Sequence, residues 1–431
     1  RLEGIVRAVN ASSVSPPAPA TALMDPPPPT VHAPSGLGPD DDPRRWGMLV
    51  LLAVAELLGM ALWFAGNAGA PALAQRWGLS GNEVAGLTTA VQLGFVGGTA
   101  LIAFANLADI VPARTLFAVC AMLGAVANAG LVVAGTYGVA LATRVAAGAC
   151  LAGVYPPAMK MASTWFRARR GLAVGTVVGA LTVGKALPYL LKSFPFFTLE
   201  AVVLSASAAA VAAAALVWFA YHDGPYPFVP RPFSWRLVHD VVRERRWRLV
   251  LGGYLGHMAE LYSYWTWIPA FLAASALARS GTAPPWVSVL AFATVAIGGV
   301  GCVWGGLVAD RIGRARLTII AMAASATCAL LVAFAFGGSW WLLAPLALAW
   351  GFFVIADSAQ FSVLATESVP PHAVGTALAL QTSLGFLLTT LTIQFVPPVV
   401  QLGGWPVAFA LLAIGPLLGI RSMRALGGTA N

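Results

Sequence analysis

Two glutamates lie inside apolar runs at matching positions in the chain. Glu56 stands in the run AELLGMALW, and Glu260 stands 204 residues later in the run AELYSYWTW. In each run a tryptophan, Trp63 or Trp267, follows seven positions after the glutamate. A carboxyl group in such a run can take up a proton when its surroundings dry and release it when they are wetted. The alternative is a pair of neutral glutamic acids hydrogen-bonded between helices, and both interpretations stay open here.

Each glutamate shares a helical face with other polar or aromatic side chains. On the first run, Trp63 and Asn67 follow Glu56 at i+7 and i+11. His257 precedes Glu260 by one turn, so it is either a proton relay or a polar residue satisfied by a neighbour. The second face carries His257, Glu260, Tyr264 and Trp267.

Two cations also lie deep in apolar segments. Arg144 and Lys185 could hold a substrate carboxylate, or they could neutralise acidic side chains of the protein. Asp357, followed by Gln360 one turn later, is a possible partner for either cation. Lys160 is closer to a segment end, where a long side chain can reach water.

The composition indicates where these side chains must be held. The chain has 431 residues, of which 59% are hydrophobic and 10% charged, and its mean hydropathy is +0.80. Soluble domains carry about 25% charged residues. A soluble globule of this composition would expose too much apolar surface, so the sequence predicts an integral membrane protein of the all-α class.

Apolar windows of bilayer-crossing length, about 20 residues each, recur along the chain. They are long and unbroken, unlike the alternating strands of about 10 residues in a membrane barrel. We therefore predict twelve transmembrane helices, near 46–70, 84–105, 115–135, 138–163, 171–193, 197–221, 248–276, 286–308, 315–336, 340–363, 373–396 and 402–421.

The net charge of +9 is distributed unevenly between the connections. With the N-terminus placed inside, seventeen arginines fall on the inner side, whereas Arg76, Lys192 and Arg279 fall on the outer side. This asymmetry predicts a multi-pass protein of the cell (plasma or inner) membrane with both termini in the cytoplasm. It also explains the charge without a nucleic acid.

Three sequence landmarks occur twice in the same order. Besides the glutamate runs, AVGT at 173–176 returns at 373–376, and LADIVPAR returns as VADRIGRAR at an offset of 201. We infer two six-helix halves, 44–221 and 248–424. Six helices are an even number, so both halves enter from the same side, with a pseudo-twofold axis along the membrane normal and a site between them.

The remaining segments are linkers and tails. The stretch 222–247 is a basic cytoplasmic linker, and 425–431 is a short cytoplasmic tail. Residues 1–43 hold ten of the thirty prolines and no apolar core, so we predict a disordered cytoplasmic tail. The chain begins with Arg1, and Met24 is a candidate for the true start.

One loop carries a family resemblance. The segment GLVADRIGR at 306–314 resembles the G-x-L-a-D-r-x-G-r loop of the major facilitator superfamily, and Arg144 with Gly148 resembles its R-x-x-x-G motif. The first-half copy is degraded, since Pro112 replaces a glycine. The loop residues that the resemblance assigns to gating are Asp109, Arg114, Gly306, Asp310, Arg311, Gly313 and Arg314. The resemblance implies that the first and seventh helices line a central cavity.

The two loop aspartates suggest a reversible latch. A carboxylate gains when it meets the N-terminus of another helix, by about 0.3–1 kcal/mol, and up to about 2 when partly buried. We expect Asp109 to meet the eleventh helix and Asp310 the fifth, across the boundary between the halves. The alternative is that these residues only stabilise a tight loop.

The function predicted is secondary active transport by alternating access, with no cofactor and no metal. The chain has no phosphate-binding nucleotide loop, and its five histidines are scattered, which argues against an enzyme. The protein is expected to act as a monomer on a small molecule and protons. A small organic or inorganic anion is preferred. The alternative is proton-coupled efflux of apolar or cationic compounds by a cage of Trp63, Tyr264, Trp265 and Trp267.

Overall fold

The computed structural model describes residues 42–427 apart from 168, 195–197 and 227–233, and apart from the side chains of 109, 170 and 371. The described residues are helical and contain no strand, which confirms the all-α fold. The predicted tail 1–43 lies outside the described part except for its last two residues, and so do the last four residues of the tail 425–431.

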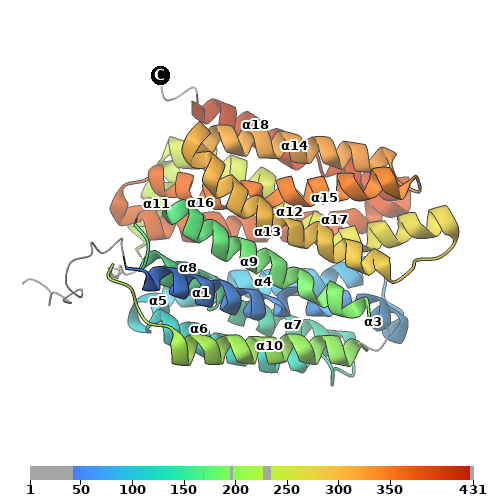
Figure 1. Ribbon diagram of the computed structural model, residues 1–431, viewed down its shortest axis with the longest axis horizontal. Helices are drawn as coiled ribbons and strands as arrows, with labels where there is room; N and C mark the ends of the chain where they lie inside the picture. Colours follow the sequence, from blue (N-terminus) through green and yellow to red (C-terminus); the bar gives the residue numbers. More distant parts are fainter. Residues whose placement is uncertain (1–41, 168, 195–197, 227–233, 428–431) are drawn as a thin grey trace, which may run out of the picture. The chain divides into compact units, whose positions relative to one another are not determined.

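The first half contains the helices α1 to α10 (Figure 1). Their bounds are α1 (Arg44–Met60), α2 (Leu62–Ala68), α3 (Ala70–Trp77), α4 (Gly81–Phe104), α5 (Leu107–Ile110), α6 (Ala113–Ala129), α7 (Tyr137–Leu151), α8 (Tyr155–Ser163), α9 (Arg170–Lys192) and α10 (Leu199–Ala220).

The linker contains the short helix α11, and the second half follows it. The bounds are α11 (Trp235–Arg243), α12 (Arg245–Ser280), α13 (Trp286–Ile312), α14 (Arg314–Phe334), α15 (Trp340–Ala356), α16 (Ser358–Glu367), the 3-10 turn η2 (Pro371–Ala373), α17 (Val374–Leu411) and α18 (Ile414–Gly427).

Nine helical segments in the described part are long and apolar enough to cross a membrane. Of the other predicted spans, 115–135 coincides with α6, which has 17 residues, and 248–276 with α12. One of the nine segments, Val374–Gly427, covers both 373–396 and 402–421, on either side of Gly404. At Gly404 φ is +77°, a backbone conformation that glycine adopts at little cost. The first arm of α17 therefore ends at Gly404. The sequence suggests an earlier end, at Pro397 and Pro398, but both prolines lie inside the helix. The count of twelve stays a prediction.

Several predicted spans are broken within the bundle, among them the tenth, at Asp357. The first is divided at Ala61 and at Gly69 into α1, α2 and α3. The fourth is divided between α7 and α8, and Pro156 and Pro157 occupy the first turn of α8. Proline lacks a backbone donor and is tolerated in a first turn, so the break falls just before these prolines.

Most helix packing lies within the two halves, and two helix pairs make the main contacts between them. Within the first half α4 packs on α7 and α1 on α9 and α10, and within the second half α12 packs on α17 and α18. The two main pairs are α9 with α13 and α4 with α17, beside a smaller contact of α9 with α16. We call these pairs the α9–α13 seam and the α4–α17 seam.

Small residues allow the α9–α13 seam to close. A Cβ built on Gly175 would lie 3.0 Å from the carbonyl oxygen of Cys302, and one on Gly179 would lie 2.8 Å from that of Gly299. One turn further, a Cβ on Gly306 would lie 3.0 Å from the carbonyl oxygen of Gly171. Backbones approach this closely only where side chains are absent, so these glycines permit the contact between the halves.

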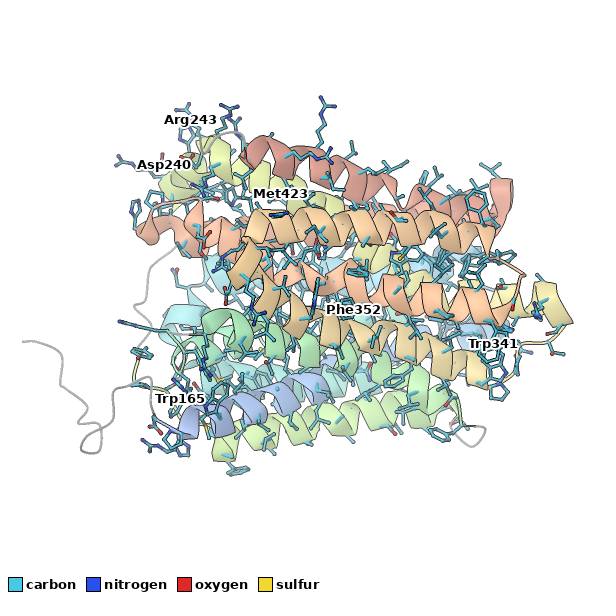
Figure 2. The ribbon with its side chains drawn as sticks, turned by 45° about the horizontal axis from the view of Figure 1, so that its top comes forward. Trp165, Asp240, Arg243, Trp341, Phe352 and Met423 are labelled. Atoms are coloured by element: carbon cyan, nitrogen blue, oxygen red, sulfur yellow. The ribbon has the colours of Figure 1, made fainter. Side chains whose placement is uncertain are left out.

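The described chain begins and ends at the same end of the helix bundle (Figure 1). We call this the termini end and the other the opposite end. Figure 2 shows Asp240 and Arg243 of α11 at the termini end and Trp341, the second residue of α15, at the opposite end. Arg45, Arg243 and Arg311 are exposed or near the surface at the termini end, whereas the middle of the bundle is lined by buried side chains.

Candidate functional site

A small cavity lies in the middle of the bundle, where the two halves meet. Its volume is about 40 Å³. It is lined mainly by aromatic side chains and by one cation, among them Trp63, Tyr155, Lys185, Tyr262, Trp265 and Phe386. Helices α2, α8 and α9 contribute from the first half, and α12 and α17 from the second, so this cavity sits where relative movement of the halves would change its size.

Lys185 is the cation of this cavity. Its side chain is 1% exposed, and its Nζ donates a hydrogen bond of 2.5 Å to the hydroxyl of Tyr262. The same Nζ lies 3.9 Å from the ring centre of Trp63 and 4.9 Å from that of Trp265. A desolvated ammonium over an aromatic face gains about 2 kcal/mol, so rings from both halves hold the charge. No carboxylate in the described part lies within 4 Å of it.

Glu56 is the acid that acts electrostatically on Lys185. It projects from α1, is fully buried, and interacts with Lys185 across the α1–α9 contact without forming a direct ion pair. Neither carboxyl oxygen has a hydrogen-bond partner among the described residues. Burying a carboxylate without partners is costly, and Glu56 is therefore an unusual acid for a packed helix bundle.

Two indole N–H groups near Lys185 are also unpaired. Trp63 and Trp265 are each 1% exposed, and neither Nε1 has an acceptor in the described part of the chain. Buried donors normally have acceptors. With the Lys185 ammonium, they are buried donors on residues that line this cavity.

Arg144 is buried away from this cavity and braces the first span. Its Nη1 donates to Asn128 Oδ1 at 2.9 Å, and its Nη2 donates to the carbonyl oxygens of Leu62 and Trp63. The guanidinium thus bonds to the backbone of α2 just after the break at Ala61. Arg144 therefore supports the backbone that carries Trp63.

Glu260 and Tyr264 face the interior of the second half. Glu260 Oε1 accepts hydrogen bonds from Ser325 Oγ at 2.6 Å and from Trp350 Nε1 at 2.8 Å. Tyr264 donates to the carbonyl oxygen of Ala347 at 3.0 Å and packs on Trp350. Both side chains contact α14 or α15 and do not line the central cavity, and neither points toward lipid.

His257 and Asp357 form a buried pair between α12 and the junction of α15 and α16. His257 Nδ1 lies 2.9 Å from Asp357 Oδ1, and both side chains are 1% exposed. His257 Nε2 has no acceptor in the described part. Asp357 is also close enough to Glu260 to influence it electrostatically, so the three groups make a polar cluster inside the second half.

Asn67 and Trp267 lie nearer the opposite end. The amide of Asn67 donates to Thr88 Oγ1, and Trp267 Nε1 donates to the carbonyl oxygen of Ile393 at 3.1 Å. Both side chains line a second, larger cavity of about 470 Å³ between the halves. The polar face expected on the seventh span is thus divided between this cavity and the interior of the second half.

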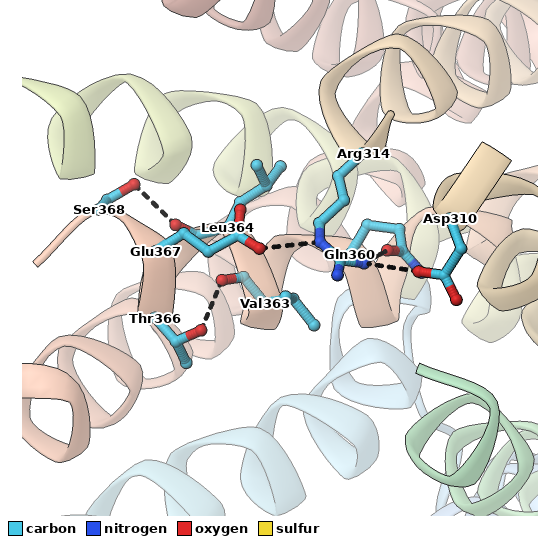
Figure 3. Close-up of polar contacts among 8 residues, drawn as sticks. All are labelled: Asp310, Arg314, Gln360, Val363, Leu364, Thr366, Glu367 and Ser368. Carbon is cyan, nitrogen blue, oxygen red and sulfur yellow. Dashed lines mark hydrogen bonds and ion pairs between the residues drawn. The ribbon is translucent and has the colours of Figure 1, made fainter. Parts of the chain in front are cut away.

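The second-half loop forms a polar network at the termini end (Figure 3). Arg314 donates to Glu367 Oε1 at 3.0 Å and to Gln360 Oε1 at 3.1 Å, and its Nη1 lies 3.5 Å from Asp310 Oδ1. Gly313 has φ +90° at the turn between α13 and α14, where a side chain would be strained. Arg311 is exposed.

Asp310 also reaches the start of α9, as expected for a latch. A Cβ built on Gly171, in the first turn of α9, would lie 3.7 Å from Asp310 Oδ2. The carboxylate of α13 in the second half therefore lies beside the positive end of a first-half helix. Gly306 brings the two backbones together one turn away.

The first-half loop is built differently. Pro112, which replaces the glycine, has φ −53° and cannot adopt the positive φ of Gly313. Asn106 takes the left-handed conformation instead, at φ +50°, before the short helix α5. Arg114 is exposed and lies 5.7 Å above the ring of Trp218. The side chain of Asp109 lies outside the described residues, so its expected contact with the eleventh span stays a prediction.

Sequence reasoning missed several side chains of the central cavity. Tyr262 and Phe386 look like ordinary core aromatics in the sequence, and Tyr155 lies next to the prolines of α8. The available signal was the second face of α12, where Met258, Leu261, Tyr262 and Trp265 follow at helical spacing and line this cavity.

In the part of the chain that the structure describes, no three metal-ligating side chains gather.

A two-bundle helical membrane protein with a charged cavity between its bundles has the architecture of a solute transporter. A family model described as the Major Facilitator Superfamily matches residues 51–393. The chain therefore belongs to the Major Facilitator Superfamily, a family of secondary transporters, and this membership points to a transporter and not to an enzyme. Comparison with proteins of curated function finds no significant match.

Two solved structures share the fold. The crystal structure of the human organic anion transporter MFSD10 (TETRAN) has a TM-score of 0.66 and 14% identity, covering 89% of this chain and 100% of that one. The bacterial homologue of the human lysosomal transporter Spinster, inward-facing and unoccupied, has a TM-score of 0.61 and 14% identity, covering 89% of this chain and 94% of that one. At this identity the likeness shows the fold alone.

Proposed function

We propose that this transporter moves a small organic anion together with a proton, and that Lys185 binds the anionic group. The observation that carries the proposal is the position of the Lys185 ammonium between Trp63, Tyr262 and Trp265. An organic anion would place its carboxylate at this ammonium and at the indole N–H groups, and its apolar body against the rings.

The same geometry favours an anion over a cation. An aromatic cage can bind a cationic ligand, but here the ammonium of Lys185 occupies the cage. A cationic compound would have to displace Lys185 or accept repulsion from it. Moreover, Tyr264 is bonded within the second half, which leaves fewer rings for the cage on which the efflux alternative depends.

Glu56 supplies the proton coupling in this proposal. Before the anion binds, the Glu56 carboxylate balances the positive charge of Lys185. The bound anion balances that charge instead, and Glu56 then binds a proton because an unpaired buried carboxylate is costly. Anion and proton would thus enter together and leave together. The orientation with both termini in the cytoplasm of a cell membrane, and action as a monomer, belong to the same proposal.

Uptake by proteoliposomes tests the proposal. We expect an inwardly directed proton gradient to accelerate uptake of radiolabelled benzoate. The change Lys185→Met should abolish uptake, whereas Glu56→Gln should retain binding and lose the response to the gradient. Arg76→Gln is a matched control, because Arg76 forms an exposed ion pair with Glu200 far from the cavity.

Two results would overturn the proposal. One is benzoate uptake that persists in the Lys185→Met protein. The other is uptake of an organic cation that Lys185→Met leaves intact while no member of a panel of carboxylates, sulfonates and phosphates is transported. Thermal melting of each variant establishes that it is folded.

A further inference from the structure

The larger cavity near the opposite end has the size of a ligand-binding site. Its volume of about 470 Å³ lies within the range of about 300–1,000 Å³ that is common for small-molecule pockets. Side chains of α2, α3 and α9 line one side, and those of α12 and α13 line the other. Most of the wall is alanine and proline, and the polar lining comes from few residues, among them Asn67, Tyr189, Lys192, Thr266 and Ser288.

Tyr189 lines this cavity and carries a buried hydroxyl without a partner among the described residues. Its side chain is 4% exposed, its ring packs 6.0 Å from that of Phe64, and its hydroxyl has no partner in the described part of the chain. The Oδ1 atom of Asn67 is unpaired there as well. Buried polar groups without partners are uncommon in native proteins, so a ligand group bonded to the Tyr189 hydroxyl would account for it.

Lys192 places a positive charge beside Tyr189. Lys185, Tyr189 and Lys192 follow one another at i, i+4 and i+7 on α9, so they share one helical face. Seven residues span about 10.5 Å along a helix axis. No acidic side chain of the described residues lies within 4 Å of Lys192. The face of α9 between the two cavities thus carries a cation, a hydroxyl and a second cation in order.

We propose that this larger cavity, which we call the outer cavity, is a second binding site for an organic anion. The anion occupies it before it reaches Lys185. The carboxylate contacts Lys192 and the Tyr189 hydroxyl, and the apolar body lies against Trp267 and the alanine and proline wall. The chemical identity of the ligand rests on the proposed function, whereas the preference of the cavity for negative charge rests on Lys192 and Tyr189 alone.

Thiol labelling at the cavity wall tests the charge preference. The variant Ser288→Cys is treated with the anionic sulfonatoethyl methanethiosulfonate and with the cationic trimethylammonioethyl methanethiosulfonate, and labelling of the wild-type cysteines is subtracted. We expect the anionic reagent to react faster, and we expect Lys192→Met to lower the ratio of the two rates by about fivefold or more. Arg76→Gln, the matched control at the same end, should leave the ratio unchanged.

Protection by benzoate tests the site itself. Benzoate should slow labelling of Ser288→Cys, and Tyr189→Phe or Lys192→Met should weaken that protection. Lys185→Met should leave the protection intact, because Lys185 lines the other cavity. The inference is overturned if Lys192→Met leaves the rate ratio unchanged or if benzoate gives no protection at any concentration that supports uptake.

The two proposals fail separately. If carboxylates are not transported but the charge preference depends on Lys192, the proposed function is wrong and the outer anion site stands. If benzoate uptake depends on Lys185 but Lys192→Met does not change the labelling ratio, the inference of an outer anion site is wrong and the proposed function stands.

Discussion

The two seams that join the halves are related by the sequence repeat, yet they are closed in different places. Gly175 and Gly375 occupy equivalent positions, 200 residues apart. A Cβ built on Gly175 would touch the backbone of Cys302, whereas a Cβ built on Gly375 would have no neighbour among the described side chains within 4 Å. The α9–α13 seam is therefore tight toward the termini end, and Gly375 of α17 makes no such contact with the described residues.

The α4–α17 seam is closed nearer the opposite end. A Cβ built on Gly81 would lie 3.0 Å from Cβ of Pro397, and Gln394 donates to Thr89 Oγ1 at 3.2 Å. In the middle, the rings of Phe95 and Phe386 lie 4.4 Å apart. Two repeat copies thus hold the halves together at opposite ends, which lets one contact open while the other persists.

The largest effect is expected from filling the tight position of the α9–α13 seam. Gly175→Leu should separate α9 from α13, because overpacking typically costs about 1–3 kcal/mol. Cys302, which is 1% exposed in that seam, reports the separation. We expect its alkylation by N-ethylmaleimide, followed by mass spectrometry, to accelerate about tenfold. The matched change Gly375→Leu should leave this rate within about twofold of wild type, and equal effects of the two changes would refute the difference between the seams.

A smaller effect is expected at the α4–α17 seam. Gln394→Leu removes its hydrogen bond to Thr89, worth about 0.5–1.5 kcal/mol. A disulfide between Gly81→Cys and Pro397→Cys reports closure of that end, since disulfide bonding requires close Cβ atoms. We expect cross-linking to slow about threefold in the Gln394→Leu background, while alkylation of Cys302 stays at the wild-type rate. Faster Cys302 alkylation would show that the two contacts open together.

The smallest effect is expected in the repeated loops. Arg314→Gln removes contacts with Asp310, Gln360 and Glu367, whereas Arg114→Gln removes, among the described residues, an exposed contact above Trp218. Exposed ion pairs contribute about 0–1 kcal/mol, so Arg314→Gln should raise Cys302 alkylation by about twofold. Arg114→Gln should not change it. A larger effect of Arg114→Gln would mean that the degraded loop also acts on this seam.

The fold was predictable because a membrane-spanning helix can be recognised from the length and the apolar composition of its sequence. The spans near 84–105 and 315–336 differ from the helices observed by a few residues at either end, whereas the span near 340–363 is divided at Asp357. The less regular elements were harder to place. Proline suggests the end of a helix, yet Pro397 and Pro398 lie inside α17, and the turn follows at Gly404.

The site was only partly predictable. The position of a residue along a helix can be counted from the sequence, but the neighbour that its side chain faces cannot. Lys185 and Trp63 were placed correctly as deep residues, and they meet in the central cavity. The polar face of α12 with Glu260 and Tyr264 was expected to line the pathway, but its partners Ser325, Trp350 and Ala347 belong to the same half. Those partners are 65 to 90 residues away in sequence, and only the packing of α14 and α15 brings them there.

Arg144 illustrates the same limit. Its depth and its charge made it a candidate for anion binding, since an arginine in a membrane segment is costly without a function. Its acceptors are Asn128 and two carbonyl groups of the broken first span. No sequence pattern shows which carbonyl oxygens of a neighbouring span a buried guanidinium will meet.

The central claim, that Lys185 binds the negative group of the substrate, is tested most directly by a pair of ligands of nearly equal shape. Benzoate and benzylammonium both present a benzene ring and differ in the sign of their charge. We expect benzoate to raise the melting temperature of the purified protein and benzylammonium to leave it unchanged, because a ligand stabilises the state that it binds. The benzoate effect should vanish in Lys185→Met. Stabilisation by benzylammonium in place of benzoate, or a benzoate effect that survives Lys185→Met, would contradict the account.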